Sequence, residues 1–169
     1  MNAKCYAENK IINSKVINKE INLSEFLCQF GDGSGELDLC KQLTLAREAK
    51  DAELVDLLLY LSAVIKFDYY DVDILNQLVT DPWHQKHEEI VRLLDHYRQP
   101  SSVDPLYKAA LLNLDYRDYD EDFILANKCT RVLEKIQDQN AIEKMELLAS
   151  ADNELIRQYA KKHLNRVRR

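Results

Sequence analysis

The sequence predicts an all-α fold, a right-handed solenoid of about four stacked helix pairs. The first observation is a self-match at an offset of about 39 residues, in which 87–110 lies over 126–149. A period in this range is typical of helix-pair repeats, which bury their apolar faces only by stacking on one another. The second is that 169 residues contain only three Gly and three Pro, too few for a fold rich in tight turns. The third is the recurrence of apolar side chains at helical spacing.

The self-match covers a helix, a turn and a second helix. The matched pairs include Ile90 with Cys129, Arg92 with Arg131, Leu94 with Leu133, Asp95 with Glu134, Val103 with Ile142 and Leu106 with Met145. Most of these positions are apolar in both copies, so we expect them to form the core between successive pairs. Cys129 takes an apolar place on its helix, and we expect it to be buried.

The expected helices follow the chain in pairs. Their ranges are 36–50 with 52–66, 71–79 with 83–98, 103–113 with 121–137, and 140–150 with a last helix that Asp152 caps. Asp51 is placed to cap the helix that follows it, and Ser101 or Ser102 to cap the helix after the Pro100 turn. Residues 1–22 form a polar arm whose structure the sequence leaves undecided, with a short helix expected at 24–30. Residues 23–169 are expected to form one domain.

Charge and cysteine usage narrow the classes of function. The net charge of −6 argues against a general nucleic-acid binder and against an anionic membrane surface. It is compatible with a basic protein partner and equally with plain solubility. None of the four cysteines is spaced for a zinc site or a redox pair, which favours a reduced, cytoplasmic protein. We expect no secretory signal and no membrane span.

Two expected loops interleave carboxylates with tyrosines, FDYYDVD at 67–73 and DYRDYDED at 115–122. Tyrosine is enriched in binding hot spots, and carboxylates attract a basic partner. The candidate partner-binding residues are Asp68, Tyr69, Tyr70, Asp71, Asp115, Tyr116, Asp118, Tyr119, Asp120 and Asp122. The structural alternative is that the tyrosines pack at repeat junctions while the carboxylates cap helices and stay solvated.

Other patterns are incomplete as chemical sites. The acidic loops lack the central Gly and final Glu of a calcium loop, and GDGSG at 31–35 lacks the GK[ST] ending of a phosphate loop. His84 and His87 share a helical face, but a metal site needs more ligands, so we expect them to be structural. We therefore predict no catalytic residues, no metal and no cofactor. The basic residues near the C-terminus are interpreted as a solvated helix end.

The last helix carries the pattern Asp152-x3-Ile156-Arg157-x2-Ala160-x3-Leu164-x2-Val167. This pattern resembles the second helix of HEAT repeats, particularly the short HEAT-like type also seen in phycobilisome lyases. The first-helix phrases SSVDPLYKAAL and NAIEKMELLA fit the same repeats. The resemblance covers about the second half of the chain, and the pattern itself is clear only in the last unit. It implies a concave surface lined by second helices, which binds a protein there or at the loops along its edge.

HEAT-repeat enzymes that resemble deoxyhypusine hydroxylase hold iron through several His-Glu pairs. This sequence has one such pair, His87 with Glu88. We therefore expect a non-enzymatic protein-binding module. The sharper hypothesis is an immunity protein that neutralises a toxin of a contact-dependent or polymorphic toxin system. The alternatives are a generic scaffold or adaptor, or a HEAT-repeat enzyme of the lyase or metal-dependent type.

Overall fold

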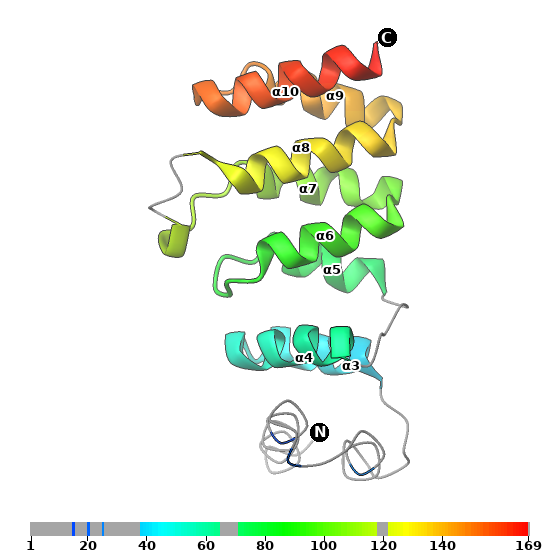
Figure 1. Cartoon of the computed structure of the whole chain (residues 1–169), viewed down its shortest axis with the longest axis vertical. Coiled ribbons are helices and arrows are strands. Elements are labelled where there is room, and N and C mark those ends of the chain that lie inside the picture. Colours follow the sequence, from blue (N-terminus) through cyan, green and yellow to red (C-terminus); the bar gives the residue numbers. More distant parts are fainter. Residues whose placement is uncertain are drawn as a thin grey trace. The chain divides into compact units, whose positions relative to one another are not determined.

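The computed structural model describes residues 38–64, 71–117 and 122–168, together with the single residues 15, 20 and 25. The elements bounded in this part are eight α-helices, α3 to α10, and two short 3₁₀ helices, η1 and η2 (Figure 1). The described residues contain no strand, so the all-α prediction is confirmed for them. None of the described helices has both the length and the apolar character needed to cross a membrane. The chain divides into two compact units, Met1–Tyr70 and Asp71–Arg169.

The described part of the first unit is one helix pair, α3 (Leu39–Glu48) and α4 (Ala52–Val64). The side chain of Asp38 caps α3 by accepting from the Lys41 backbone N–H at 2.9 Å. Asp51 accepts from the Leu54 N–H at 2.9 Å, as predicted. The predicted arm at 1–22 and the predicted helix at 24–30 lie outside the described residues, apart from the single positions above.

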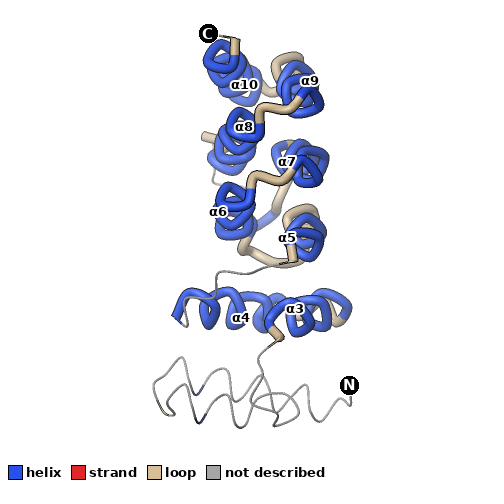
Figure 2. The backbone as a smooth tube through the Cα atoms, turned by 90° about the vertical axis from the view of Figure 1, so that its right-hand side faces the viewer, coloured by secondary structure: helices blue, strands red, loops and turns tan. Residues whose placement is uncertain are grey.

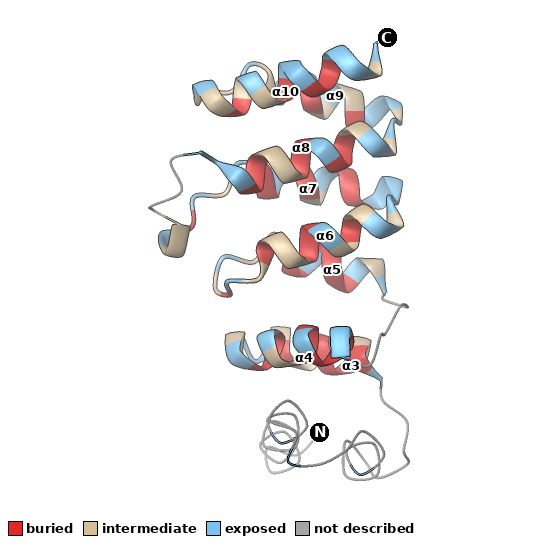
Figure 3. Ribbon diagram, viewed as in Figure 1, coloured by how far each residue is buried: buried red, intermediate tan, exposed pale blue. Residues whose placement is uncertain are grey.

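The second unit holds three helix pairs. Its elements are α5 (Val72–Leu78), α6 (His87–Tyr97), η1 (Pro100–Ser102), α7 (Val103–Ala110), η2 (Asp115–Arg117), α8 (Ile124–Ile136), α9 (Gln139–Leu148) and α10 (Glu154–Val167). Figure 2 shows them in two layers, with α5, α7 and α9 in one and α6, α8 and α10 in the other. Each helix packs on its partner in the pair and on the next helix of its own layer. The core therefore runs between the two layers (Figure 3).

The self-match reappears as matched structure. Helices α6 and α8 both end at a residue in the left-handed conformation, Arg98 with φ 50° and Gln137 with φ 59°. Each of these residues donates its N–H to the carbonyl of a matched leucine, Leu94 or Leu133. Of the apolar pairs predicted to form the core, Ile90 with Cys129, Leu94 with Leu133 and Leu106 with Met145 are buried in both copies, whereas Val103 is buried and its match Ile142 is half-buried. Burial raises the pKa of the Cys129 thiol.

Two helix starts differ from the prediction. Helix α6 begins at His87 rather than at residue 83, because the His84 side chain bonds to the Leu78 carbonyl and the Lys86 N–H and so holds 82–86 as a turn. Helix α8 begins at Ile124 rather than at residue 121, because Phe123 adopts the left-handed conformation with φ 49°. A left-handed residue interrupts the right-handed helical path.

Two predicted caps are also wrong. Asn153, not Asp152, caps α10, since its side-chain oxygen accepts from the backbone N–H groups of Leu155 and Ile156 at 2.9 and 3.1 Å. Ser102 occupies the N-cap position of α7, but its side chain makes no capping bond. The 3₁₀ turn over 100–102 already gives its backbone a helical geometry, whereas a capping side chain needs an extended one.

Candidate functional site

The helices of the second unit run antiparallel, so its connections fall at two opposite edges. The segments 79–86, 111–117, 122–123 and 149–153 lie at one edge, and the start of α5, 98–102 and 137–138 lie at the other (Figure 1). Of the ten predicted binding residues, Asp115, Tyr116 and Asp122 lie at the first edge and Asp71 lies at the second. The structure therefore does not bring Asp71 together with the other three. Asp68, Tyr69, Tyr70, Asp118, Tyr119 and Asp120 lie outside the described residues.

Asp71 and Tyr116 have structural partners. The Asp71 carboxylate caps α5 by accepting from the Asp73 N–H at 2.9 Å. The Tyr116 hydroxyl lies 2.8 Å from Nδ1 of His87. These contacts agree with the structural alternative, in which the carboxylates cap helices and the tyrosines pack between repeats. Asp115 and Asp122 are exposed.

A cleft of about 210 Å³ opens at this edge between the turn before α6 and the segment around η2. We call it the edge cleft. It is lined by Pro82, Trp83, His84, Gln85, Asn113, Leu114, Asp115 and Tyr116. Trp83 is half-buried and packs its ring edge against His84, with 5.2 Å between ring centroids. The edge cleft therefore combines two aromatic side chains with a carboxylate.

Two buried histidines form the base of this arrangement. His84 accepts the Lys86 N–H at Nδ1 (3.1 Å), so its Nε2–H donates to the Leu78 carbonyl (2.7 Å). His87 donates Nε2–H to the Asp81 carbonyl (3.0 Å), so its Nδ1 accepts the proton of the Tyr116 hydroxyl. The two imidazoles stack with centroids 4.3 Å apart. Both nitrogens of each ring are thus used, and metal binding by either ring would require one of these bonds to break.

Both imidazoles are neutral near neutral pH. Burial lowers the pKa of His84. Burial lowers the pKa of His87 to about 4, and the stacked His84, which would be a like charge if protonated, lowers it further. A neutral imidazole keeps the acceptor that the Tyr116 hydroxyl needs, whereas a protonated one would present a second donor. Among the described residues, no three His, Cys, Asp or Glu side chains are grouped as they would be around a metal ion.

The loop that carries the predicted residues is held on both flanks. On one side, Arg117 forms an ion pair with Glu88 at the start of α6. Burial raises the pKa of Glu88, but hydrogen bonds from Lys128 and Arg117 lower it by more, so this carboxylate is ionised. On the other side, the hydroxyl of Tyr159 on α10 donates to the Asp122 carbonyl at 2.7 Å. These contacts tie Arg117 to α6 and the main chain at Asp122 to α10.

Apolar side chains are exposed beside the same loop. Leu111, Phe123 and Ile124 are 45, 37 and 41 % exposed. The sequence predicts helices over Trp83 and Phe123, and no pattern in it points to the ion pair of Arg117. The left-handed backbone of Phe123 is unusual for a bulky residue and turns the chain into α8 at this edge. No pattern in the sequence marks that conformation.

Comparison of the chain with models of known protein families, with curated proteins and with solved structures finds no match.

Proposed function

We propose that this protein is a non-enzymatic protein-binding module of HEAT-like helix pairs stacked as a right-handed solenoid. The observation that carries the proposal is the edge cleft, which Trp83, Tyr116 and Asp115 line together. Leu111 and Phe123, in the connection between α7 and α8, expose apolar side chains at the same edge. Aromatic and apolar side chains around a shallow cleft, with carboxylates at its margin, are the composition of a protein-binding hot spot. In this proposal the whole edge, 111–124 with the turn 82–85, contacts the partner.

The repeat geometry supports the HEAT-like part of the proposal. Second helices α6, α8 and α10 lie in one layer, and first helices lie in the other (Figure 2). The left-handed ends at Arg98 and Gln137 stand 39 residues apart, which is the period of the self-match. Repeat proteins of this kind bind macromolecules along their inner layer or along the loops of one edge.

The charge of the edge indicates the chemistry of the partner. Asp115 and Asp122 are exposed, and the loop between them adds Asp118, Asp120 and Glu121 in the sequence. Carboxylates beside aromatic side chains suit a surface rich in Arg and Lys, which aromatic rings also bind through cation–π contacts. Our sharper proposal is an immunity protein that neutralises, in the cytoplasm, a toxin domain with such a basic surface. Many toxins of this kind are nucleases, whose nucleic-acid sites are basic.

The test begins with the gene that lies beside the one for this protein. If it encodes a secreted toxin, its toxin domain is expressed in cells with and without this protein, and survival is measured. The affinity of the two purified proteins is then measured by isothermal titration calorimetry for wild type, for the double variant Asp115→Arg/Asp122→Arg, and for Glu143→Arg. Glu143 is an exposed carboxylate on α9 that bonds only to Gln139 among the described residues.

We expect protection by the wild type and a Kd at least about tenfold weaker for the double variant, since tenfold corresponds to about 1.4 kcal/mol. Glu143→Arg is expected to bind nearly as wild type does. Equal affinities for both variants would reject the edge as the binding surface. The immunity proposal is abandoned if no toxin is encoded nearby, or if the toxin domain kills cells equally with and without this protein.

A further inference from the structure

A second surface, which shares only Gln85 with the lining of the edge cleft, lies between two second helices. A groove of about 390 Å³ runs between α6 and α8, and we call it the α6–α8 groove. Its floor contains Val91 and Val132, which are 2 and 0 % exposed. Two ion pairs join the helices across it, Glu88 with Lys128, and Asp95 with Lys135 at 2.5 Å. The pairs are seven residues apart on each helix, about two turns, so the groove has an apolar floor and a bridge at each end.

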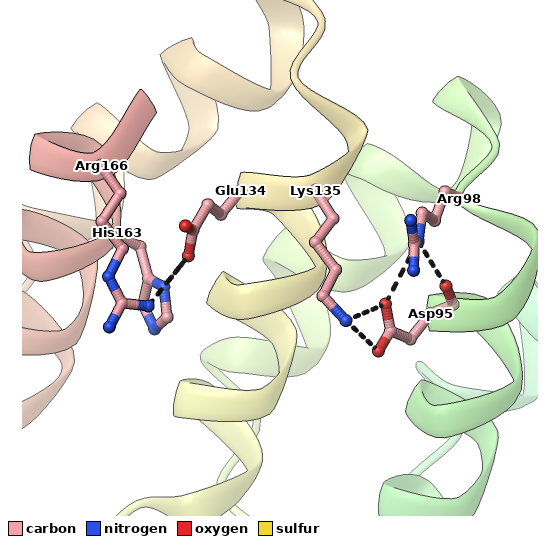
Figure 4. A network of polar contacts seen from close by, with 6 residues as sticks. All are labelled: Asp95, Arg98, Glu134, Lys135, His163 and Arg166. Atoms are coloured by element: carbon pink, nitrogen blue, oxygen red, sulfur yellow. Dashed lines mark hydrogen bonds and ion pairs between the residues drawn. The ribbon is translucent and has the colours of Figure 1, made fainter. Parts of the chain in front are cut away.

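The next junction of the same layer, between α8 and α10, shows why this groove is open. Glu134 lies 39 residues after Asp95 and accepts from Arg166 of α10 at 3.4 Å, as Asp95 accepts from Lys135 (Figure 4). Matching Lys135 with Arg166 places Val132 at the position of His163. The imidazole of His163 is 2 % exposed and bonds to two residues of α8, Glu134 and Asn127. A histidine thus fills the position that Val132 leaves open between α6 and α8.

The charged residues at this groove also differ between α6 and the matched positions of α8. On α6, Arg92 forms two hydrogen bonds with the Glu89 carboxylate, at 2.5 and 3.0 Å. The positions 39 residues later are Arg131 and Lys128, so the carboxylate that holds Arg92 is replaced by an ammonium group beside Arg131. Arg131 is exposed and lines the groove, and its guanidinium forms no hydrogen bond or ion pair with any residue that the structure describes. Because Lys128 stands where the previous repeat has the Glu89 carboxylate, the positive charge of the Arg131 guanidinium has no paired carboxylate.

We propose that the α6–α8 groove binds an acidic side chain of a partner protein, with Arg131 as its counter-ion. A carboxylate can accept two parallel hydrogen bonds from a guanidinium, the geometry that Arg92 and Glu89 already show one repeat earlier. Glu88, Glu89 and Asp95 line the same groove, and they would repel the repeated charges of a nucleic acid more than the single charge of one carboxylate. This surface is independent of the edge cleft, and it holds or fails separately from the proposal above.

The test is an NMR titration of the ¹⁵N-labelled full chain with blocked pentapeptides, Gly-Val-Glu-Val-Gly and its Gln counterpart. We expect the Glu peptide to shift amide signals of α6 and α8 in a saturable way at millimolar concentration. The Gln peptide is expected to bind at least about tenfold more weakly, since it lacks the charge. The variant Arg131→Gln should lose the preference for Glu. The matched control is Lys162→Gln, because Lys162 is the exposed residue of α10 that corresponds to Arg131 and does not line the groove.

A second variant, Val132→His, places in the groove the side chain that fills the next junction, and it should bind neither peptide. Its fold is checked by its amide spectrum, and Arg131→Gln, a surface change, decides the question if Val132→His does not fold. The proposal is overturned if neither peptide gives saturable shifts, if both bind equally, or if Arg131→Gln keeps the preference for Glu. An oligothymidylate of about 12 nucleotides is titrated in parallel. Tighter binding of this strand through the same amides would overturn the proposal in favour of a nucleic-acid site.

Discussion

The hydroxyl of Tyr116 donates a 2.8 Å hydrogen bond to Nδ1 of His87, whose side chain has no exposed surface. Tyr116→Phe removes the donor and leaves a buried acceptor unpaired, which costs about 1–3 kcal/mol in proteins. Tyr116 is half-buried and lines the edge cleft, so water can approach the vacated position and replace part of the bond. We therefore expect the lower half of that range, a loss of about 1–1.5 kcal/mol in the free energy of unfolding.

The assay is urea denaturation followed by tryptophan fluorescence. Trp83 is the single tryptophan of the chain, and its ring packs against His84 beside the bond in question. The signal therefore reports the unfolding of the second unit. The midpoint should move to lower urea while the slope of free energy against urea stays the same, because the surface exposed on unfolding hardly changes.

The control is Tyr107→Phe. The Tyr107 hydroxyl has no hydrogen bond with the described residues, and its ring contact with the Lys144 ammonium at 5.1 Å is kept by phenylalanine. We expect this change to stay within about 0.5 kcal/mol of wild type. Equal stabilities for the two variants would refute the reasoning. A double-mutant cycle with His87→Phe measures the coupling energy between Tyr116 and His87. A value near zero would show that their hydrogen bond contributes no net stability.

Two further predictions follow from the same unit. Because the folded pKa of His87, about 4, lies below its ordinary 6.5, the unfolded chain binds an extra proton between these values. The free energy of unfolding should therefore be largest above pH 6.5 and fall by up to about 3 kcal/mol as the pH drops to 4, at about 1.4 kcal/mol per pH unit. Urea titrations across this range should show the fall, and His87→Gln should make it shallower, with His84, whose pKa is also lowered, keeping part of it; an equally steep fall in this variant would assign the effect to other groups. Asn153→Ala should cost about 1 kcal/mol by circular dichroism, and Asp152→Ala less than about 0.5, since only Asn153 caps α10; the reverse order would contradict the observed cap.

The sequence was sufficient to predict the helices and much of the core. Ile90 and Cys129, or Leu94 and Leu133, recur at one spacing because both copies bury the same face, and burial is confirmed for all four. Such positions follow from hydrophobic periodicity, which needs no knowledge of distant contacts. The cap at Asp51 was also predictable, because a cap depends on residues within one turn.

The helix starts and the site depended on contacts that local patterns do not encode. The turn before α6 exists because His84 bonds to a carbonyl six residues earlier. The bond between His87 and Tyr116 joins residues 29 apart in sequence, across a connection whose length varies between repeats. The correspondence of Val132 with His163 likewise depends on the alignment of α8 with α10, which the ion pairs of Lys135 and Arg166 define. The sequence pattern singles out 115–122 as a candidate, but not Trp83, which lines the edge cleft together with Asp115 and Tyr116.

The left-handed residues at the helix ends make the folded protein less stable than glycine at these positions would. All three glycines precede residue 38, so the described residues that adopt positive φ all carry a side chain. Gln137 is exposed at the edge opposite the cleft, at the end of α8, and a β-carbon in this conformation costs roughly 1 kcal/mol that glycine avoids. Gln137→Gly should therefore provide a more stable parent chain that leaves both proposed binding surfaces unchanged. In such a parent, damaging substitutions such as Tyr116→Phe or Val132→His can be compared for what they do to recognition, with folding no longer limiting the experiment.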